Sequence, residues 1–300
     1  MLKRNCFYCH ETSDLYLESA NNDKNKKFNF ASSELYTENS ELKPNLFYCK
    51  NCEIIFSELC DKNFEKNYVD VYDPLYVDQI ENKKHYFNNL INKISHKIKL
   101  SDDVLEIGSY YGAFGSQIKK KVKDYKGIEL SPNACSFAKK NFDLDIENIN
   151  IFDFFKKNNK KYDVIFMFDV IEHLDNPDLV LDLCSKNLKT DGRLIISTMN
   201  MDSLFAKITG KYYQWIIAMH KFYFTDKSMT KFLDKNNLQL DKILNDVRII
   251  SLEYFFLKIS QKIPLLRFIY LIVKKIKFLK NLKIKLSFFD INIYCASLKK

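Results

Sequence analysis

Two pairs of cysteines lie near the start of the 300-residue sequence, each with two residues between its members. Cys6 and Cys9 form the first pair, and Cys49 and Cys52 form the second. A C-x-x-C turn brings two thiolates near the separation that tetrahedral Zn²⁺ requires, and two such turns close a four-thiolate site. The alternatives are unligated buried cysteines or a redox pair. We therefore predict a structural zinc site in a small N-terminal module, residues 1–75, that depends on the metal to fold.

A second group of residues has the composition of a nucleotide-cofactor site. Half of the six glycines of the chain lie at positions 108, 112 and 115, directly after an apolar run. Glycine permits a tight turn and lets a ligand lie against bare backbone. Glu129 ends the next apolar run, 21 residues after Gly108, where an acid can accept hydrogen bonds from both hydroxyls of a ribose. No lysine follows the glycines as in GxxxxGK[ST], which argues against a nucleoside triphosphate site.

The elements that must position these groups alternate along the chain from residue 103. Short apolar runs, typical of buried strands, alternate with amphipathic stretches, typical of helices. This alternation predicts βαβ units and a parallel sheet. The spacing of apolar residues before it predicts a linker helix over residues 76–100. The predicted strands cover residues 104–107, 125–130, 163–168 and 193–197, and the predicted helices between them cover residues 132–141 and 178–188.

These residues and elements together resemble the class I S-adenosylmethionine-dependent methyltransferases. Residues 104–115 are similar to motif I, residues 162–177 to the fourth strand with its Glu-His stretch, and residues 191–198 to the fifth strand. Tyr110 stands at the middle position of the usual E/D-x-G-x-G-x-G, a variant that also occurs in this family. The resemblance implies a Rossmann-like α/β domain over residues 101–300, with a doubly wound, mostly parallel seven-stranded sheet. The alternative is a dinucleotide-binding Rossmann unit.

The same resemblance implies S-adenosylmethionine as the cofactor and places its contacts at the ends of the strands. Asn150 falls where an acid usually meets the adenine amino group; its amide oxygen can accept that hydrogen bond, and Asp153 is the alternative. Asp169 follows the fourth strand and is expected to face the methionine end of the cofactor. The predicted cofactor-binding residues are Glu106, Gly108, Ser109, Tyr110, Gly112, Glu129, Leu130, Asn150, Ile151 and Asp169.

The whole chain also resembles a narrower group, the zinc-headed methyltransferases that act on sugars and secondary metabolites. The resemblance rests on the cysteine pairs, on the tyrosine-rich stretch 68–76 and on the aromatic stretch 215–225. In sugar C-methyltransferases of this group, a Tyr and a Glu-His pair serve catalysis; here Met219 stands in place of the Glu. His220 is therefore the predicted general base for transfer to a hydroxyl, with Tyr72 as the second catalytic candidate. The alternatives are a structural His220 and a Tyr72 that packs between domains.

The net charge of +9 is concentrated in one segment. Nine Lys/Arg and no Asp/Glu lie between Tyr254 and Lys285, and the rest of the chain has 38 basic and 38 acidic residues. The spacing of Leu265, Ile269 and Ile272 predicts an apolar helical face. Residues 254–286 are thus predicted to form a basic amphipathic helical excursion before the last strand. This excursion either packs as a solvated helical pair or contacts an anionic membrane surface or a lipid-linked substrate.

The chain has neither a secretory signal nor an apolar run of membrane-spanning length, so it is expected in the cytoplasm or at the inner face of the membrane. Cysteines in that compartment are not expected to form disulfides. The predicted function is methyl transfer to a hydroxyl of a small-molecule, sugar or glycan acceptor. The alternatives are a sugar C-methyltransferase, a non-catalytic S-adenosylmethionine-binding module, and a nucleic-acid methyltransferase. The balanced charge of most of the chain and the lack of an Asn-Pro-Pro-Tyr-type motif argue against nucleic acid.

Overall fold

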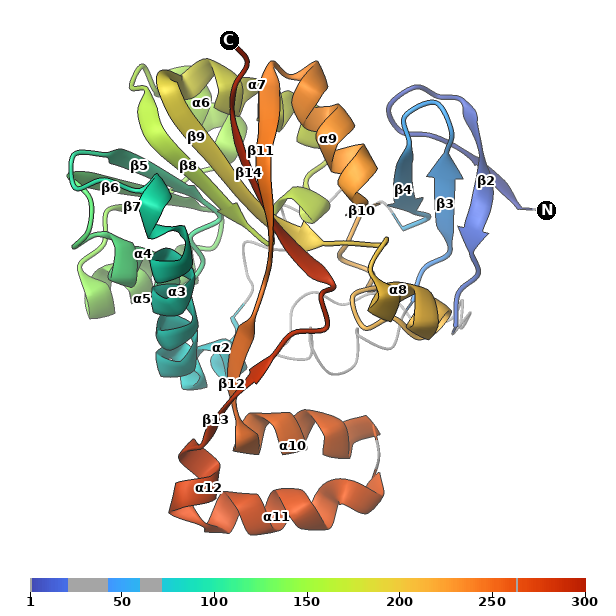
Figure 1. The fold of residues 1–300 in the computed structure, drawn as a ribbon, viewed down its shortest axis with the longest axis vertical. Coiled ribbons are helices and arrows are strands. Elements are labelled where there is room, and N and C mark those ends of the chain that lie inside the picture. Colours follow the sequence, from blue (N-terminus) through green and yellow to red (C-terminus); the bar gives the residue numbers. More distant parts are fainter. Residues whose placement is uncertain (1, 21–42, 60–71, 263) are drawn as a thin grey trace.

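The computed structural model describes residues 2–20, 43–59, 72–262 and 264–300 (Figure 1). Tyr68, in the tyrosine-rich stretch, lies outside the described residues. The described residues form two large sheets and a helical projection carried by a two-stranded ribbon.

Seven strands form the main sheet, in the order β11-β14-β9-β8-β5-β6-β7. The five strands from β9 to β7 are parallel, and β14 and β11 are antiparallel to their neighbours. This arrangement confirms the predicted Rossmann-like, mostly parallel seven-stranded sheet. The strands are β5 (Asp103–Ile107), β6 (Asp124–Glu129), β7 (Ile146–Asn148), β8 (Tyr162–Phe168), β9 (Leu188–Met199), β11 (Leu238–Asn245) and β14 (Ile291–Leu298).

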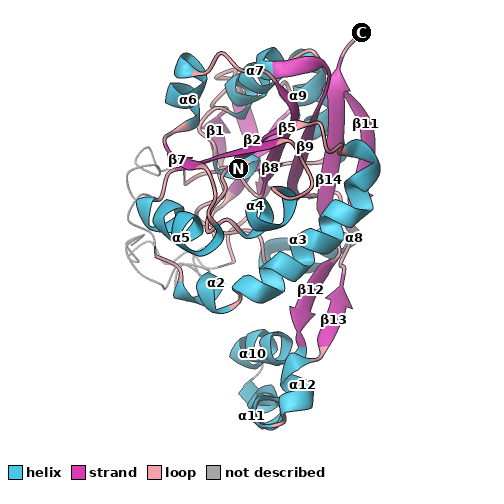
Figure 2. Ribbon diagram, turned by 90° about the vertical axis from the view of Figure 1, so that its left-hand side faces the viewer, coloured by secondary structure: helices cyan, strands magenta, loops and turns pink. Residues whose placement is uncertain are grey.

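Helices cover both faces of this sheet because its strands are apolar on both sides. Successive residues of β9 alternate between the faces: Leu194 and Ile196 pack in one core cluster, and Ile195 packs in the other. The second cluster receives α3 (Ile80–Ile94), α4 (Ala113–Ile118) and α5 (Pro132–Phe142), and the first receives α6 (Ile151–Lys157), α7 (Pro177–Asn187) and α9 (Asp226–Lys235) (Figure 2). The sheet is therefore doubly wound, as predicted.

The predicted linker helix, residues 76–100, is divided into three pieces. These pieces are α2 (Pro74–Asp78), α3 and the 3-10 turn η3 (Ser95–Lys97). Asp73 caps α2 by accepting a hydrogen bond from the Tyr76 amide at 2.9 Å, and Pro74 follows it at the first helical position. This Asp-Pro pair is a helix-start signal, which explains why the helical segment begins before residue 76.

The N-terminal segment forms a five-stranded antiparallel sheet in the order β1-β2-β3-β4-β10. Its strands are β1 (Lys3–Asn5), β2 (Thr12–Leu17), β3 (Leu46–Cys49), β4 (Ile54–Ser57) and β10 (Phe222–Tyr223). The last of these comes from the aromatic stretch far along the chain: Phe222 pairs with Phe56, and Tyr223 pairs with Ile55. The N-terminal sheet is thus completed by a segment that follows β9 of the main sheet.

Residues between β11 and β14 leave the domain as a two-stranded ribbon that carries a group of helices (Figures 1 and 2). The ribbon pairs β12 (Arg248–Ser251) with β13 (Lys283–Leu286), and the helices are α10 (Leu252–Lys262), η6 (Pro264–Leu266), α11 (Arg267–Lys275) and α12 (Lys277–Asn281). The excursion before the last strand was predicted, but its helix is interrupted at Ile276, whose backbone is extended. Within the described ranges, no helix combines the length and apolar character needed to cross a bilayer.

Candidate functional site

The glycine-rich turn connects β5 to α4 at the carboxyl end of the sheet. Gly108 and Gly112 have φ values of +74° and +76°, a conformation that side chains with a Cβ rarely adopt. The amides of Gly108 and Ser109 donate to the Ile128 carbonyl at 3.0 and 3.1 Å. A Cβ added to Gly108 would lie 2.4 Å from Cγ2 of Val170, just after β8. The turn is therefore fixed between the ends of β5, β6 and β8.

The carboxylate of Glu129 is held against this turn by backbone amides. Its Oε2 accepts a hydrogen bond from the Tyr110 amide, and its Oε1 accepts one from the Ser131 amide, both at 2.8 Å. Burial raises the pKa of Glu129, and the two amides act in the opposite direction. Each carboxylate oxygen has two acceptor positions. Glu129 is therefore held rigidly and retains the chemical capacity to accept hydrogen bonds from a ribose.

Tyr110, at the middle position of the turn, directs its side chain toward α2. Its hydroxyl donates to Oδ2 of Asp73 at 3.0 Å, and its ring packs edge-on against the ring of Tyr76 at 4.7 Å. The neighbouring Tyr111 hydroxyl accepts a hydrogen bond from the Asp73 amide at 2.9 Å. Tyrosine in place of glycine at position 110 thus joins the turn to the start of α2.

Glu106 and Ser109 lie beneath the turn, where both are buried. Glu106 accepts a hydrogen bond from the Tyr125 hydroxyl, and the Ser109 hydroxyl donates to the Glu106 carbonyl at 3.3 Å. Burial raises the pKa of Glu106 to about 8, and the hydrogen bond from Tyr125 opposes this rise. These contacts support the turn from inside, and a direct contact of either residue with the cofactor stays a prediction.

Asn150 and Asp169 lie further along the edge of the sheet. Asn150 caps α6: its Oδ1 accepts from the Asp153 amide at 2.8 Å, and its Nδ2 donates to Oδ2 of Asp153 at 2.7 Å. Asp169 follows β8 with a φ of 53°, is exposed, and accepts from the Ser197 hydroxyl at 2.9 Å. The two remaining predicted cofactor residues are Leu130, half-buried, and Ile151, buried.

Two histidines lie close to the end of β8. His173 is in the 3-10 turn η4 (Ile171–His173), and His220 precedes β10; their rings are edge-to-face with centroids 4.7 Å apart. The Nδ1 atom of His173 lies 3.1 Å from the Met219 carbonyl, and that of His220 lies 2.8 Å from the Trp215 carbonyl. A carbonyl can only accept, so in each neutral ring Nδ1 carries the proton and Nε2 is the basic nitrogen.

Glu172 lies beside the two rings, with its carboxylate and the ring nitrogens within 4.8 Å of one another. Its Oε2 accepts from the Thr198 hydroxyl at 3.0 Å. Burial lowers the pKa of His173 to about 4. Burial also lowers the pKa of His220 well below its ordinary value, and the neighbouring His173 lowers it further. Both imidazoles are therefore neutral at physiological pH.

The two predicted catalytic residues lie in different surroundings. His220 is 5% exposed, whereas Tyr72 is 56% exposed and directly precedes Asp73, the partner of Tyr110. In the part of the chain that the structure describes, no hydrogen bond or ring contact joins Tyr72 to His220. Glu172 and Asp73 have no place in the site predicted from the sequence. The Asp-Pro signal at the start of α2 could have indicated Asp73, whereas no local signal pairs Glu172 with His220.

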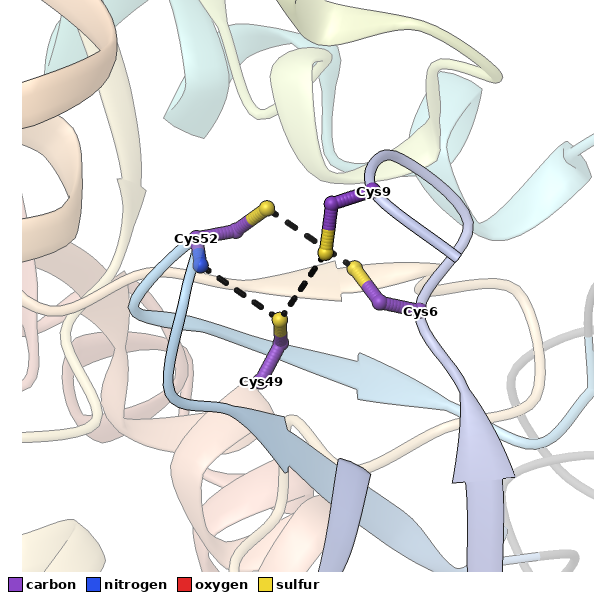
Figure 3. Close-up of side chains that lie close together, drawn as sticks. All are labelled: Cys6, Cys9, Cys49 and Cys52. Atoms are coloured by element: carbon purple, nitrogen blue, oxygen red, sulfur yellow. Dashed lines mark hydrogen bonds between the residues drawn. The ribbon is translucent and has the colours of Figure 1, made fainter. Parts of the chain in front are cut away.

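The four N-terminal cysteines come together where the turn between β1 and β2 meets the turn between β3 and β4 (Figure 3). The Sγ atoms of Cys6 and Cys52 are 3.9 Å apart, those of Cys9 and Cys49 are 3.5 Å apart, and all four lie within 4.8 Å of one another. A tetrahedral zinc site with Zn–S bonds of about 2.3 Å has sulfur–sulfur separations of about 3.8 Å. The predicted grouping of the cysteines is therefore confirmed, and its geometry fits zinc.

Each C-x-x-C turn is followed by a residue in the left-handed backbone conformation. His10 after Cys9 and Glu53 after Cys52 both have a φ of 58°. In the second turn the Cys52 amide also donates to the Cys49 sulfur at 3.4 Å. The two turns thus have matching backbone geometry, as expected of a pair of knuckles that share one metal.

The parallel sheet with its glycine turn and amide-held acid defines a Rossmann-like fold. A family model described as a methyltransferase domain matches residues 80–243, more than half of the chain. The protein therefore belongs to the methyltransferase-domain family, and the predicted enzyme class is confirmed at the level of the family.

Two curated relatives are both described as ubiquinone biosynthesis O-methyltransferase. The one from Glaesserella parasuis is 28% identical over 124 residues, which are 38% of this chain and 50% of the relative. The one from Nitrosomonas europaea is 24% identical over 136 residues, which are 43% of this chain and 56% of the relative. The chain thus spans about half the length of the curated relatives that it matches.

Two solved structures show the same fold at low identity. One, provisionally described as a methyltransferase from Bacillus halodurans, has a TM-score of 0.50 at 12% identity and covers 71% of this chain and 99% of its own. The other is a Haloferax volcanii complex of the Trm112 methyltransferase activator with its methyltransferase partner. That structure has a TM-score of 0.52 at 10% identity and covers 80% of this chain and 100% of its own. These similarities support the fold alone.

Proposed function

We propose that the protein transfers a methyl group from S-adenosylmethionine to a hydroxyl of a small-molecule, sugar or glycan acceptor. The observation that carries the proposal is the carboxylate of Glu129, which backbone amides hold at a turn whose glycines have positive φ. Gly108 of this turn lies against Val170, which His173 follows closely in the sequence. The relatives described as O-methyltransferases support an oxygen acceptor. The sugar or glycan acceptor rests on the resemblance to the zinc-headed group. The expected location is the cytoplasm.

The residues at the sheet edge fit S-adenosylmethionine. The Glu129 carboxylate would accept hydrogen bonds from the ribose hydroxyls, the bare backbone at Gly108 would face the amino-acid part, and Asn150 would lie near the adenine. Exposed Asp169 would face the methionine end. When bound, this cofactor supplies an electrophilic methyl group on a sulfonium. Tyr110 does not prevent this role, because its side chain is directed to Asp73 and Tyr76.

His220 would serve as the general base through Nε2, because its Nδ1–H donates to the Trp215 carbonyl. The acceptor hydroxyl would give its proton to Nε2 as its oxygen receives the methyl group that the bound cofactor would supply. The lowered pKa of His220 keeps the imidazole unprotonated before the reaction. The carboxylate of Glu172, within 4.8 Å, would stabilise the imidazolium that forms. Exposed Tyr72 would contact the acceptor at the rim of the site.

The four cysteines would hold one structural Zn²⁺. The Sγ–Sγ separations of 3.9 and 3.5 Å and the paired knuckle geometry support this assignment. The site would supply no open coordination position, because four thiolates complete a tetrahedron. Its contribution would be to fold the N-terminal sheet.

The test is to compare wild-type protein with His220→Gln, using the exposed His96→Gln as the matched control. Calorimetric titration with S-adenosylhomocysteine measures cofactor affinity, and mass spectrometry of methylated acceptors measures turnover. We expect unchanged cofactor affinity in both variants and a loss of roughly 10²–10⁴-fold in turnover for His220→Gln alone. Full turnover in His220→Gln would exclude the general-base role. Failure of folded wild-type protein to bind the cofactor would exclude the methyltransferase proposal.

A further inference from the structure

The helices α10, η6, α11 and α12, here called the paddle (residues 252–262 and 264–281), project away from both large sheets (Figures 1 and 2). The three α-helices pack on one another, and the ribbon strand β12 packs against α3. At the domain end of the ribbon, the Tyr86 hydroxyl donates to Oδ1 of Asp246 at 2.9 Å, and at its paddle end the Leu252 amide donates to the Leu282 carbonyl at 2.8 Å. The ribbon therefore fixes where the paddle emerges.

Large apolar side chains on the paddle and its base are exposed to an extent unusual for a solvated helical pair. Leu265 is 79% exposed, Phe278 is 73% exposed and Phe268 is 57% exposed. On α11, Val273 is the residue that is buried. The other exposed members are Leu271, Ile272, Ile276 and Leu282, each at least 40% exposed. A contiguous patch of solvent-exposed apolar side chains marks an interaction surface.

The apolar residues follow a helical spacing. Phe268 and Ile272 are four residues apart on α11, so they lie on one side of that helix, and Leu265 precedes it in η6. Val273, on a different side of α11, is buried. Leu265 and Ile272 of the predicted apolar face are exposed and Ile269 is half-buried, so part of this face contacts solvent.

Cations surround this apolar surface. Arg267, Lys274, Lys275 and Lys277 are exposed, and Glu253 is the single acidic residue in the sequence between Asp246 and Asp290. Glu253 already pairs with Lys280, 3.8 Å away. Exposed aromatic and aliphatic side chains lie among lysines whose charge is not balanced by acidic residues. This composition suits the boundary between anionic headgroups and acyl chains.

We propose that the paddle docks on an anionic phospholipid bilayer. Phe268, Phe278 and Leu265 enter the headgroup–acyl boundary, and the surrounding lysines contact lipid phosphates. A second copy of this chain is a poorer partner for the same surface, because a two-fold contact would place one basic surface against another. The positive charge of the paddle thus favours an anionic bilayer over a second copy of the chain at its apolar surface.

The experiment is co-sedimentation of the full chain with phosphatidylcholine vesicles and with vesicles of phosphatidylcholine mixed with phosphatidylglycerol. We expect binding to the mixed vesicles only, weakening as salt is added. Equal binding to both vesicles, or no binding to either by folded protein, would overturn the proposal. Size-exclusion chromatography with light scattering runs alongside: a dimer that Phe268→Ser disrupts, without vesicle binding, would assign the surface to a second copy instead.

Variants separate the two components of docking. Phe268→Ser with Phe278→Ser should weaken partitioning into the mixed vesicles by at least roughly tenfold. Lys274→Gln with Lys277→Gln should weaken it by roughly 25-fold at low salt.

The matched control is Leu100→Ser with Leu179→Ser, which removes two exposed leucines outside the paddle and should not change partitioning. Circular dichroism of each variant reports whether the domain is folded, so the docking result is independent of the methyltransferase proposal. If the paddle variants bind the vesicles as strongly as the wild type does, the paddle is excluded as the docking surface.

Discussion

Glu129 combines two roles at a single residue. Its carboxylate accepts from the amides of Tyr110 and Ser131, and the same group is the proposed acceptor for the ribose. A substitution here therefore affects both the ligand and the turn that surrounds it.

We expect Glu129→Ala to weaken S-adenosylhomocysteine binding by more than the roughly 1–3 kcal/mol of a lost charge-assisted hydrogen bond, because the Tyr110 and Ser131 amides lose their acceptor as well. Glu129→Gln retains one acceptor oxygen and should lose less. Calorimetric titration of both variants measures the difference. Wild-type affinity in Glu129→Ala would show that the cofactor binds elsewhere.

The buried histidines predict how stability depends on pH. The pKa of His173 is lowered to about 4 and that of His220 is also lowered, both chiefly by burial. Between the unfolded pKa of about 6.5 and the folded value, the unfolded chain binds more protons. The free energy of unfolding should therefore fall as the pH drops through this window, by up to about 1.4 kcal/mol per pH unit for each histidine.

The measurement is urea unfolding at several pH values between 7 and 4, a window set by the two lowered pKa values. His173→Gln should reduce the slope of stability against pH, and the exposed His96→Gln should leave it unchanged. Glu106, whose pKa is raised to about 8, contributes with the opposite sign, but this contribution cancels when variant and wild type are compared. An identical slope in His173→Gln would mean that His173 is protonated in the folded protein.

At the scale of elements, apolar runs predicted the strands that are buried on both faces, such as β5 and β8, to within one residue at most ends. The strands of the main sheet that were missed lie at its two edges. β7 has only three residues, and β11 is largely exposed, with its register set by pairing to β14. Edge strands receive their conformation from a neighbour, so a local pattern carries little of the information.

The two-residue strand β10 shows the same limit at the candidate site. The glycine turn and Glu129 were predictable because their spacing is local. The position of His220 was not, since it depends on Phe222 and Tyr223 pairing with β4, far away in the sequence. The sequence could thus indicate His220 as a base without indicating Glu172 and His173 as its surroundings.

The short helix α2 is expected to hold the turn from outside. Asp73 caps α2, accepts from the Tyr110 hydroxyl, and donates through its amide to Tyr111. Asp73→Ala should lower the free energy of unfolding by about 1 kcal/mol through the lost cap and weaken S-adenosylhomocysteine binding severalfold through Tyr110. Asp73→Asn keeps a capping side chain and is the control. If Asp73→Ala is destabilised but binds the cofactor with unchanged affinity, α2 does not support the cofactor site.

At the scale of the molecule, the N-terminal sheet and the Rossmann-like domain share one core. Cys6, Cys49 and Phe56 pack in the same cluster as Phe222 and Ile107. The metal site that would fold the N-terminal sheet is thus connected through β4 and β10 to His220, two residues before β10. The glycine turn and Glu129, by contrast, belong to β5 and β6 of the main sheet.

Removal of zinc should therefore affect turnover and cofactor binding differently. A chelator should release the metal, loosen β4 and β10 and lower turnover, whereas S-adenosylhomocysteine binding should remain within severalfold of its original value. Trp215 is the only tryptophan of the chain, and its carbonyl accepts from His220, so its fluorescence should change as the metal leaves.

The ligand variant Cys52→Ser should reproduce the effect of the chelator, and Cys295→Ser, which alters a buried cysteine of β14 outside the cluster, should not. Zinc content is measured on the same samples. Stripped protein with unchanged fluorescence and full turnover would show that the N-terminal sheet holds His220 in place without the metal. A loss of cofactor binding in parallel with turnover would instead show that the shared core transmits the disturbance to the whole domain.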